Sequence, residues 1–201
     1  CFCKEPKGHR PTCPHDGAAV DSFAWSRSPV PPEQQIRGLG PIMISVPIFP
    51  VTDVLLREGM NMRKAREYPH PEHAGHTVHV YEMGAGGAAA ELHVAVQPDL
   101  PRASPGAGGV HHVAFRTPDA DYEAWADRLN SLGIRNSGKV DRFYFRSLYF
   151  REPNGILFEI ASDGPGFATD ESEATMGERV ALPPFLEPHR AEIVAGLKPI
   201  D

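Results

Sequence analysis

The run VDRFYFRSLYFREPNGILFEIA, residues 140–161, decides the fold of its half of the chain. Three of its segments, 140–145, 147–150 and 156–161, are rich in the aromatic and β-branched residues that favour strands. Pro153-Asn154-Gly155 separates the last two segments and is typical of a tight turn. The run therefore predicts three consecutive strands, with Glu159 inside the last one.

A further strand and a helix are predicted immediately before this run. Residues 109–116 form a β-rich segment, after which Thr117 and Pro118 suit the N-cap and the first position of a helix. Gly133 is placed to end that helix at its C′ position. The order of elements in this half is therefore βαβββ. The apolar residues of the helix share one face at helical spacing: Tyr122, Trp125, Ala126, Leu129 and Leu132.

The same order of elements occurs about 68 residues earlier in the chain. A short helix is expected after Pro50, and Gly59 ends it. Strands are expected at 42–46, 63–68, 76–83 and 90–96, the last two joined by the glycine-rich turn 84–87.

We therefore predict an α+β fold in which two βαβββ modules form a curved mixed sheet with helices outside it. Residues 187–197 suit a closing carboxy-terminal helix. The expected segments are an irregular tail and linker (1–37), a first module (38–106), a second module (107–165) and a closing loop and helix (166–201).

The composition indicates a globular protein that acts on small molecules. The chain has 201 residues, 41% of them hydrophobic and 23% charged, which suffices for a sizeable core. Its net charge of −6 comes without a run of Lys or Arg, so it offers no electrostatic grip on nucleic-acid phosphates. No stretch approaches the roughly 20 apolar residues of a membrane span, and the start does not read as a leader. We expect a cytoplasmic protein without membrane partners.

The second module carries two candidate metal ligands. His111 and His112 are adjacent in the predicted strand, and successive strand side chains face opposite sides, so only one can point into a shared cavity. Glu159 lies between Phe158 and Ile160, where a bare carboxylate is costly to bury without a cation or a full set of donors. One imidazole and one carboxylate with open positions are typical of non-haem Fe(II) oxygenases. Taken singly, each residue could instead be structural or solvated.

Three stretches resemble bacterial ring-cleaving dioxygenases of the vicinal oxygen chelate superfamily, which include the chlorohydroquinone and hydroquinone dioxygenases. They are GVHHVAF at 109–115, DRFYFRSLYFREPNGILFEIA at 141–161 and LPPFLE at 182–187. The resemblance implies Fe(II) held by His112 and Glu159, with Mn, Zn or Ni as alternative ions. It also implies that His111, Arg142 and Tyr149 line the substrate pocket.

The implied reaction is O₂-dependent cleavage of a hydroquinone- or catechol-type ring, so the expected partners are an aromatic diol and O₂. Arg142 would stabilise negative charge on oxygen, Tyr149 would donate a hydrogen bond, and His111 would act as acid or base. Without the resemblance, a surface ion pair for Arg142 and a core aromatic for Tyr149 are equally open. These two residues have opposite strand parity, so both reach the pocket only if a bend separates them.

The resemblance further implies a second histidine ligand, which the family takes from the first of its four modules. This chain carries two modules, so we expect a fragment completed by missing amino-terminal modules, by a homo-oligomer or by a residue of its own. His93, His9 and His15 are the candidates within the chain. Repeat alignment places Met43 at the position of His112, so the first module offers no matching ligand.

Two further readings stay open. Cys1, Cys3, Cys13 and His15 could form a zinc site in the tail, although Cys-x-Cys is tighter than the usual ligand spacing. The alternative functions are a glyoxalase-like isomerase or lyase with Zn or Ni, and a truncated binding protein without catalysis.

Overall fold

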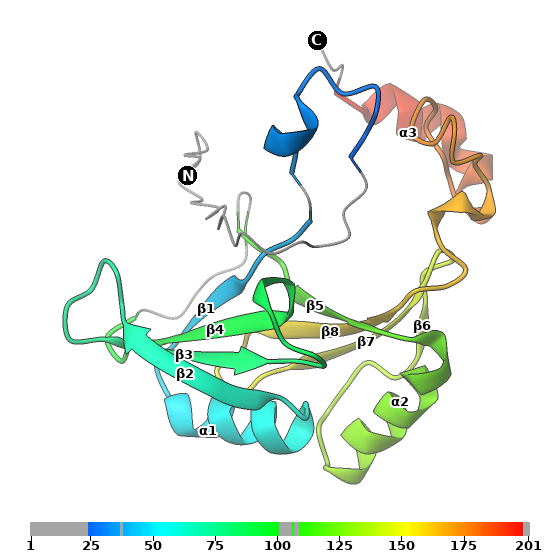
Figure 1. The fold of residues 1–201 in the computed structure, drawn as a ribbon. Helices are drawn as coiled ribbons and strands as arrows, with labels where there is room; N and C mark the ends of the chain where they lie inside the picture. Colours follow the sequence, from blue (N-terminus) through cyan, green and yellow to red (C-terminus); the bar gives the residue numbers. More distant parts are fainter. Residues whose placement is uncertain (1–23, 37, 101–105, 107–108, 199–201) are drawn as a thin grey trace. The chain divides into compact units, whose positions relative to one another are not determined.

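The computed structural model describes residues 24–36, 38–100, 106 and 109–198, which divide into two compact units. The first unit runs to His111 and also includes residues 152–155, and the second unit holds the rest from His112 onward. Each unit contains one four-stranded mixed sheet (Figure 1). The chain is therefore an α+β protein of two βαβββ modules, as predicted. No helix among the described residues is long and apolar enough to cross a membrane.

The first unit contains a sheet of strand order β1-β4-β3-β2, in which β1 and β4 are parallel and the other neighbours antiparallel. Helix α1 continues into a π turn at Leu55–Gly59, and both lie against the sheet of this unit (Figure 1). Gly59 ends the helix, as predicted. The elements are β1 (Ile42–Val46), α1 (Phe49–Val54), β2 (Arg63–Pro69), β3 (Thr77–Glu82) and β4 (Glu91–Val96).

The core of this unit is built from alternate strand residues and the apolar side of the helix. Val78, Val80 and Leu92 of the sheet are fully buried, and so is Leu56 of the π turn. Burying each such side chain contributes about 1.5–3 kcal/mol. Helix α1 begins at Phe49, so Pro50 lies in its first turn, where a missing N–H costs no intrahelical bond.

The turn at residues 152–155 belongs to the first unit by its hydrogen bonds. Asn154 accepts a bond from the Ile48 amide at 3.1 Å and donates to the Thr52 hydroxyl at 2.8 Å. Thr52 donates in turn to Glu152, whose side chain is buried, at 3.0 Å. Asn154 therefore gives the Ile48 amide, just before α1, a hydrogen-bond partner of the kind that the first turn of an isolated helix lacks.

The second unit has strand order β5-β8-β7-β6, again with one parallel pair, β5 and β8. Tyr122 is fully buried, and its hydroxyl donates to the Ser147 carbonyl at 2.8 Å, which fixes α2 against β7. The elements are β5 (Val113–Thr117), α2 (Tyr122–Ser131), β6 (Val140–Asp141), β7 (Arg146–Arg151), β8 (Leu157–Ser162) and α3 (Arg190–Gly196).

The ends of α2 were predicted in part. Gly133 follows the helix with φ of 66°, a conformation that glycine adopts without strain, so its predicted C′ role is confirmed. The predicted cap is wrong, because Thr117 is the last residue of β5 and a 3₁₀ turn at Asp119–Asp121 precedes α2. Leu132 was placed on the apolar face and is 49% exposed, because it lies beyond the last helical turn.

Candidate metal centre

The centre of the candidate site is the carboxylate of Glu159 on β8. It is 3% exposed and lies in a strand that is paired on both sides, with Ala114 of β5 and Tyr149 of β7 as its neighbours in the ladder. The Ser147 hydroxyl, two residues along β7 and on the same face, donates a hydrogen bond to Oε1. A buried carboxylate needs such partners, and Ser147 fixes its orientation.

His112 lies at the other oxygen of the same carboxylate. Its Nε2 is 2.7 Å from Oε2 of Glu159, and its side chain is 33% exposed. The structure therefore brings the two predicted ligands together. The two groups converge on one position, with the histidine on the more accessible side.

The histidine pair does not lie in a strand, contrary to the sequence prediction. Strand β5 begins at Val113, and His111 and His112 precede it in a segment outside any helix or strand. The predicted strand was too long, because residues 109–112 continue its β-rich composition but precede the ladder that pairs β5 with β8. His112 belongs to the second unit, whereas His111 is exposed and is the last residue of the continuous part of the first.

Arg142 and Tyr149 meet beside this pair. Arg142 Nε donates to the Tyr149 hydroxyl at 3.3 Å, and its guanidinium lies 5.2 Å from the centre of the Tyr149 ring. The ring of Tyr149 also contacts His112 edge-on, with ring centres 5.9 Å apart. Two residues of opposite parity meet because a turn separates them: β6 ends at Asp141, and Phe143 has φ of 70°. The predicted strand at 140–145 is therefore limited to two residues.

The second unit thus holds four of the five predicted site residues in one contact network, with Ser147 added to them. Sequence reasoning missed Ser147, although its spacing of two from Tyr149 on a strand was the available signal.

His93, a candidate third ligand, has both ring nitrogens engaged within the first unit. Nδ1 lies 2.8 Å from the Tyr68 hydroxyl and Nε2 lies 2.8 Å from Glu91 Oε2. Arg66 donates two hydrogen bonds to Glu91, at 2.7 and 2.8 Å. Hydrogen bonding to Arg66 is the largest influence that lowers the pKa of Glu91, to about 2. This arrangement leaves His93 no nitrogen to offer a metal unless one of these contacts breaks.

Strand register corrects the repeat alignment. In the parallel pairs, Met43 lies opposite His93, and Ala114 lies opposite Glu159. Met43 therefore corresponds to Ala114, and Pro41 is the counterpart of His112. The conclusion that the first module lacks a matching histidine stays the same.

Across the described ranges, no three histidine, cysteine, aspartate or glutamate side chains are already arranged to hold a metal ion. Two ligands, His112 and Glu159, are therefore what this part of the chain offers at the candidate centre. The other predicted ligands, His9, His15 and the three tail cysteines, fall outside the described residues.

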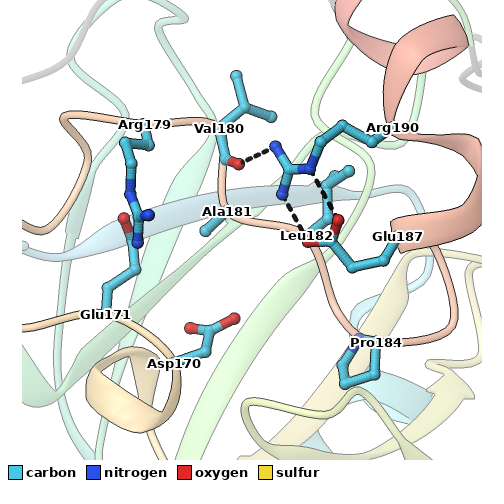
Figure 2. A pocket seen from close by; sticks show the side chains of 9 residues that line it. All are labelled: Asp170, Glu171, Arg179, Val180, Ala181, Leu182, Pro184, Glu187 and Arg190. Atoms are coloured by element: carbon cyan, nitrogen blue, oxygen red, sulfur yellow. Dashed lines mark hydrogen bonds and ion pairs between the residues drawn. The ribbon is translucent and has the colours of Figure 1, made fainter.

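A separate pocket of about 450 Å³ lies in the closing segment of the second unit (Figure 2). Arg190 lines it and donates to Glu187 through Nε at 2.7 Å and to the Val180 carbonyl at 2.8 Å. The contact with Arg190 lowers the pKa of the exposed Glu187. The pocket is lined by Asp170, Glu171, Arg179, Val180, Ala181, Leu182, Pro184, Glu187 and Arg190, none of which was predicted as a site residue.

Comparison with known proteins gives consistent matches. The family model described as "Glyoxalase/Bleomycin resistance protein/Dioxygenase superfamily" matches residues 55–160. The chain is 47% identical to "Putative ring-cleaving dioxygenase MhqA" of Bacillus subtilis over 87% of its own length and 55% of that protein. It is 32% identical to "Chlorohydroquinone/hydroquinone 1,2-dioxygenase" of Sphingobium indicum over 85% of its length and 52% of that protein.

A solved structure described as a putative dioxygenase from Bacillus subtilis superposes with a TM-score of 0.77 at 35% identity, covering 90% of this chain and 56% of that one. The chain thus spans about half the length of the curated relatives it matches.

Proposed function

We propose that this chain, which belongs to the Glyoxalase/Bleomycin resistance protein/Dioxygenase superfamily, is the metal-bearing part of an Fe(II)-dependent dioxygenase. The reaction is cleavage of a hydroquinone- or catechol-type ring by O₂. The observation that carries the proposal is the buried carboxylate of Glu159 with His112 Nε2 2.7 Å away. A relative of 32% identity is named as a chlorohydroquinone/hydroquinone 1,2-dioxygenase, which supports the substrate class.

His112 and Glu159 are ligand types that suit Fe(II), but they are fewer ligands than the ion usually has. Neutral imidazole and anionic carboxylate are donors that suit non-haem Fe(II), whereas three facial ligands are usual. When bound, the ion supplies the coordination positions at which the substrate oxygens and O₂ meet. His112 and Glu159 would hold it, and the Ser147 hydroxyl would keep the carboxylate turned toward it.

The neighbouring residues have distinct roles in this proposal. Tyr149 accepts a hydrogen bond from Arg142, so its own hydroxyl proton remains available for donation to a substrate oxygen. The guanidinium of Arg142 would lie beside that oxygen, which favours a deprotonated diol. His111, which precedes His112 in the chain and lies outside this contact network, keeps its proposed role as acid or base.

Anaerobic Fe(II) loading of the whole 201-residue chain, followed by oxygen uptake against hydroquinones and catechols, tests the proposal. With two ligands we expect weak iron retention and slow, diol-dependent oxygen uptake, increased when a partner domain supplies a histidine. Asp163→Asn, which alters an exposed carboxylate just beyond β8, is the matched control and should change neither quantity.

Two outcomes would contradict the proposal. Retention of Zn or Ni in place of iron, with no oxygen uptake, would indicate an isomerase or lyase. Failure to retain any of these ions, even with a complementing domain, would indicate a binding protein without catalysis.

A further inference from the structure

Three histidines lie close together on the loop between β2 and β3, outside the candidate centre. The β2–β3 ladder ends at the pair Pro69 and Thr77, and the His70 amide then donates to the His76 carbonyl at 2.8 Å. The His76 amide donates to the His73 carbonyl at 3.2 Å. Backbone hydrogen bonds therefore hold the loop that carries the three side chains both at its base and near its tip.

One pair of rings has the spacing of ligands of one ion, and the other two pairs are somewhat wider. Ring centres are 4.7 Å apart for His70 and His73, 5.8 Å for His73 and His76, and 6.5 Å for His70 and His76. A metal–nitrogen bond of about 2.1 Å puts two imidazole centres roughly 4.5–5.5 Å apart at coordination angles of about 90–110°. The cluster is thus within about 1 Å of that spacing before any ion is bound.

The nitrogen atoms of the cluster also indicate an absent partner. Nδ1 of His76 is buried and has no hydrogen-bond partner among the described residues. Buried polar atoms are rarely left in this state, because losing water without gaining a partner costs about 1–3 kcal/mol.

We propose that His70, His73 and His76 form a metal site for a divalent transition ion, with Zn(II) as the favoured occupant. Imidazole suits Zn(II), and three histidines leave one position for water. The described side chains do not yet converge on a single point, so binding turns the rings without moving the closed backbone. His70 Nδ1 now accepts weak bonds from the Glu72 and His73 amides, at 3.1 and 3.2 Å, and the ion competes for that lone pair.

The occupied site would clamp the connection between β2 and β3. This role is independent of the proposed dioxygenase reaction, because it uses none of the residues assigned to it. A bound ion stabilises the folded state in proportion to its occupancy, so thermal unfolding reports it without any activity measurement.

Zn(II) titration of the tag-free Glu159→Gln chain tests the site, because this background removes the carboxylate of the candidate iron centre. We expect one Zn(II) per chain, a rise in the unfolding temperature, and tetrahedral absorption bands when Co(II) replaces it. His73→Ala should weaken binding at least about tenfold and abolish the temperature shift. His189→Ala, an exposed histidine at the start of α3, is the control and should leave both unchanged.

Equal affinity in His73→Ala and in its parent would overturn the site. So would an ion that is bound but leaves the spectrum octahedral and the unfolding temperature unchanged, since that describes a loose surface ion. His76→Gln provides a second variant, which keeps a polar side chain and should lose binding while the metal-free chain still unfolds cooperatively.

Discussion

His93 in β4 and Glu159 in β8 occupy equivalent positions in the two sheets, and their surroundings differ. Each lies opposite the second residue of the first strand of its module, Met43 or Ala114. His93 is held on one side by Tyr68 and on the other by Glu91. Glu159 is held by Ser147 and has the half-accessible His112 at its other oxygen.

The difference teaches how a repeated backbone acquires one structural and one candidate chemical site. In the first module the histidine completes a closed polar network, in which Arg66 neutralises Glu91. In the second module the buried carboxylate has the partly exposed His112 at its other oxygen, and this is the pair that we propose holds the metal ion. The sheet gives both residues the same location, and their neighbours decide what they do.

The largest expected effect is on the carboxylate itself. Glu159→Gln keeps the size and the hydrogen bond to Ser147, and removes the charge that helps hold a cation. We expect iron retention to be lost while the unfolding temperature stays near that of the parent. Metal analysis after anaerobic gel filtration measures it, and unchanged iron stoichiometry would show that the carboxylate is structural.

His93→Ala should produce the opposite pattern. It removes one partner of the buried Glu91, which keeps Arg66, and it removes the His93 contact of the half-buried Tyr68 hydroxyl, so unfolding in urea should become easier by about 1–3 kcal/mol. Iron retention should not change, because both ring nitrogens already have partners. Loss of iron from this variant would identify His93 as the third ligand.

The stabilising contribution of the Arg66–Glu91–His93 network in the first module should also depend on pH. The pKa of Glu91 is about 2 in the folded chain, below the ordinary value of 4.5, so its stabilising contribution is complete above about pH 4.5 and is lost as the pH falls toward 2. Arg66→Gln should therefore lower the unfolding temperature at neutral pH and converge with the parent on acidification. Arg116→Gln breaks an exposed pair with Asp163 and should cost much less. A constant difference between Arg66→Gln and the parent at all pH values would contradict this account.

The two tyrosines provide the smallest contrast. Tyr68→Phe removes a partner of His93 and should cost about 1 kcal/mol, whereas Tyr149→Phe removes a hydroxyl that meets the exposed Arg142 and should cost less than about 0.5 kcal/mol. Chemical denaturation measures both. If Tyr149→Phe proves the more destabilising change, the hydroxyl has a structural role that its contacts do not explain.

Local sequence pattern predicted the strands and the two-module order because each strand buries alternate residues and each turn has its own chemistry. Pro153-Asn154-Gly155 and Gly133 are examples, since their backbone requirements depend on a few neighbouring residues. Where an element ends was harder to predict. The segment before Val113 has strand-like composition, but the ladder that pairs β5 with β8 begins at Val113.

The sequence by itself determined the fold class, and it named His112, Glu159, Arg142 and Tyr149 through residue type and resemblance. Only the tertiary structure decided that these four side chains meet, because their contacts cross strands and depend on the turn at Phe143. It also decided that His93 lies in a closed hydrogen-bond network and that Asn154 accepts a hydrogen bond from the Ile48 amide just before α1. Hydrogen bonds between residues distant in sequence depend on register and packing, which no local pattern contains.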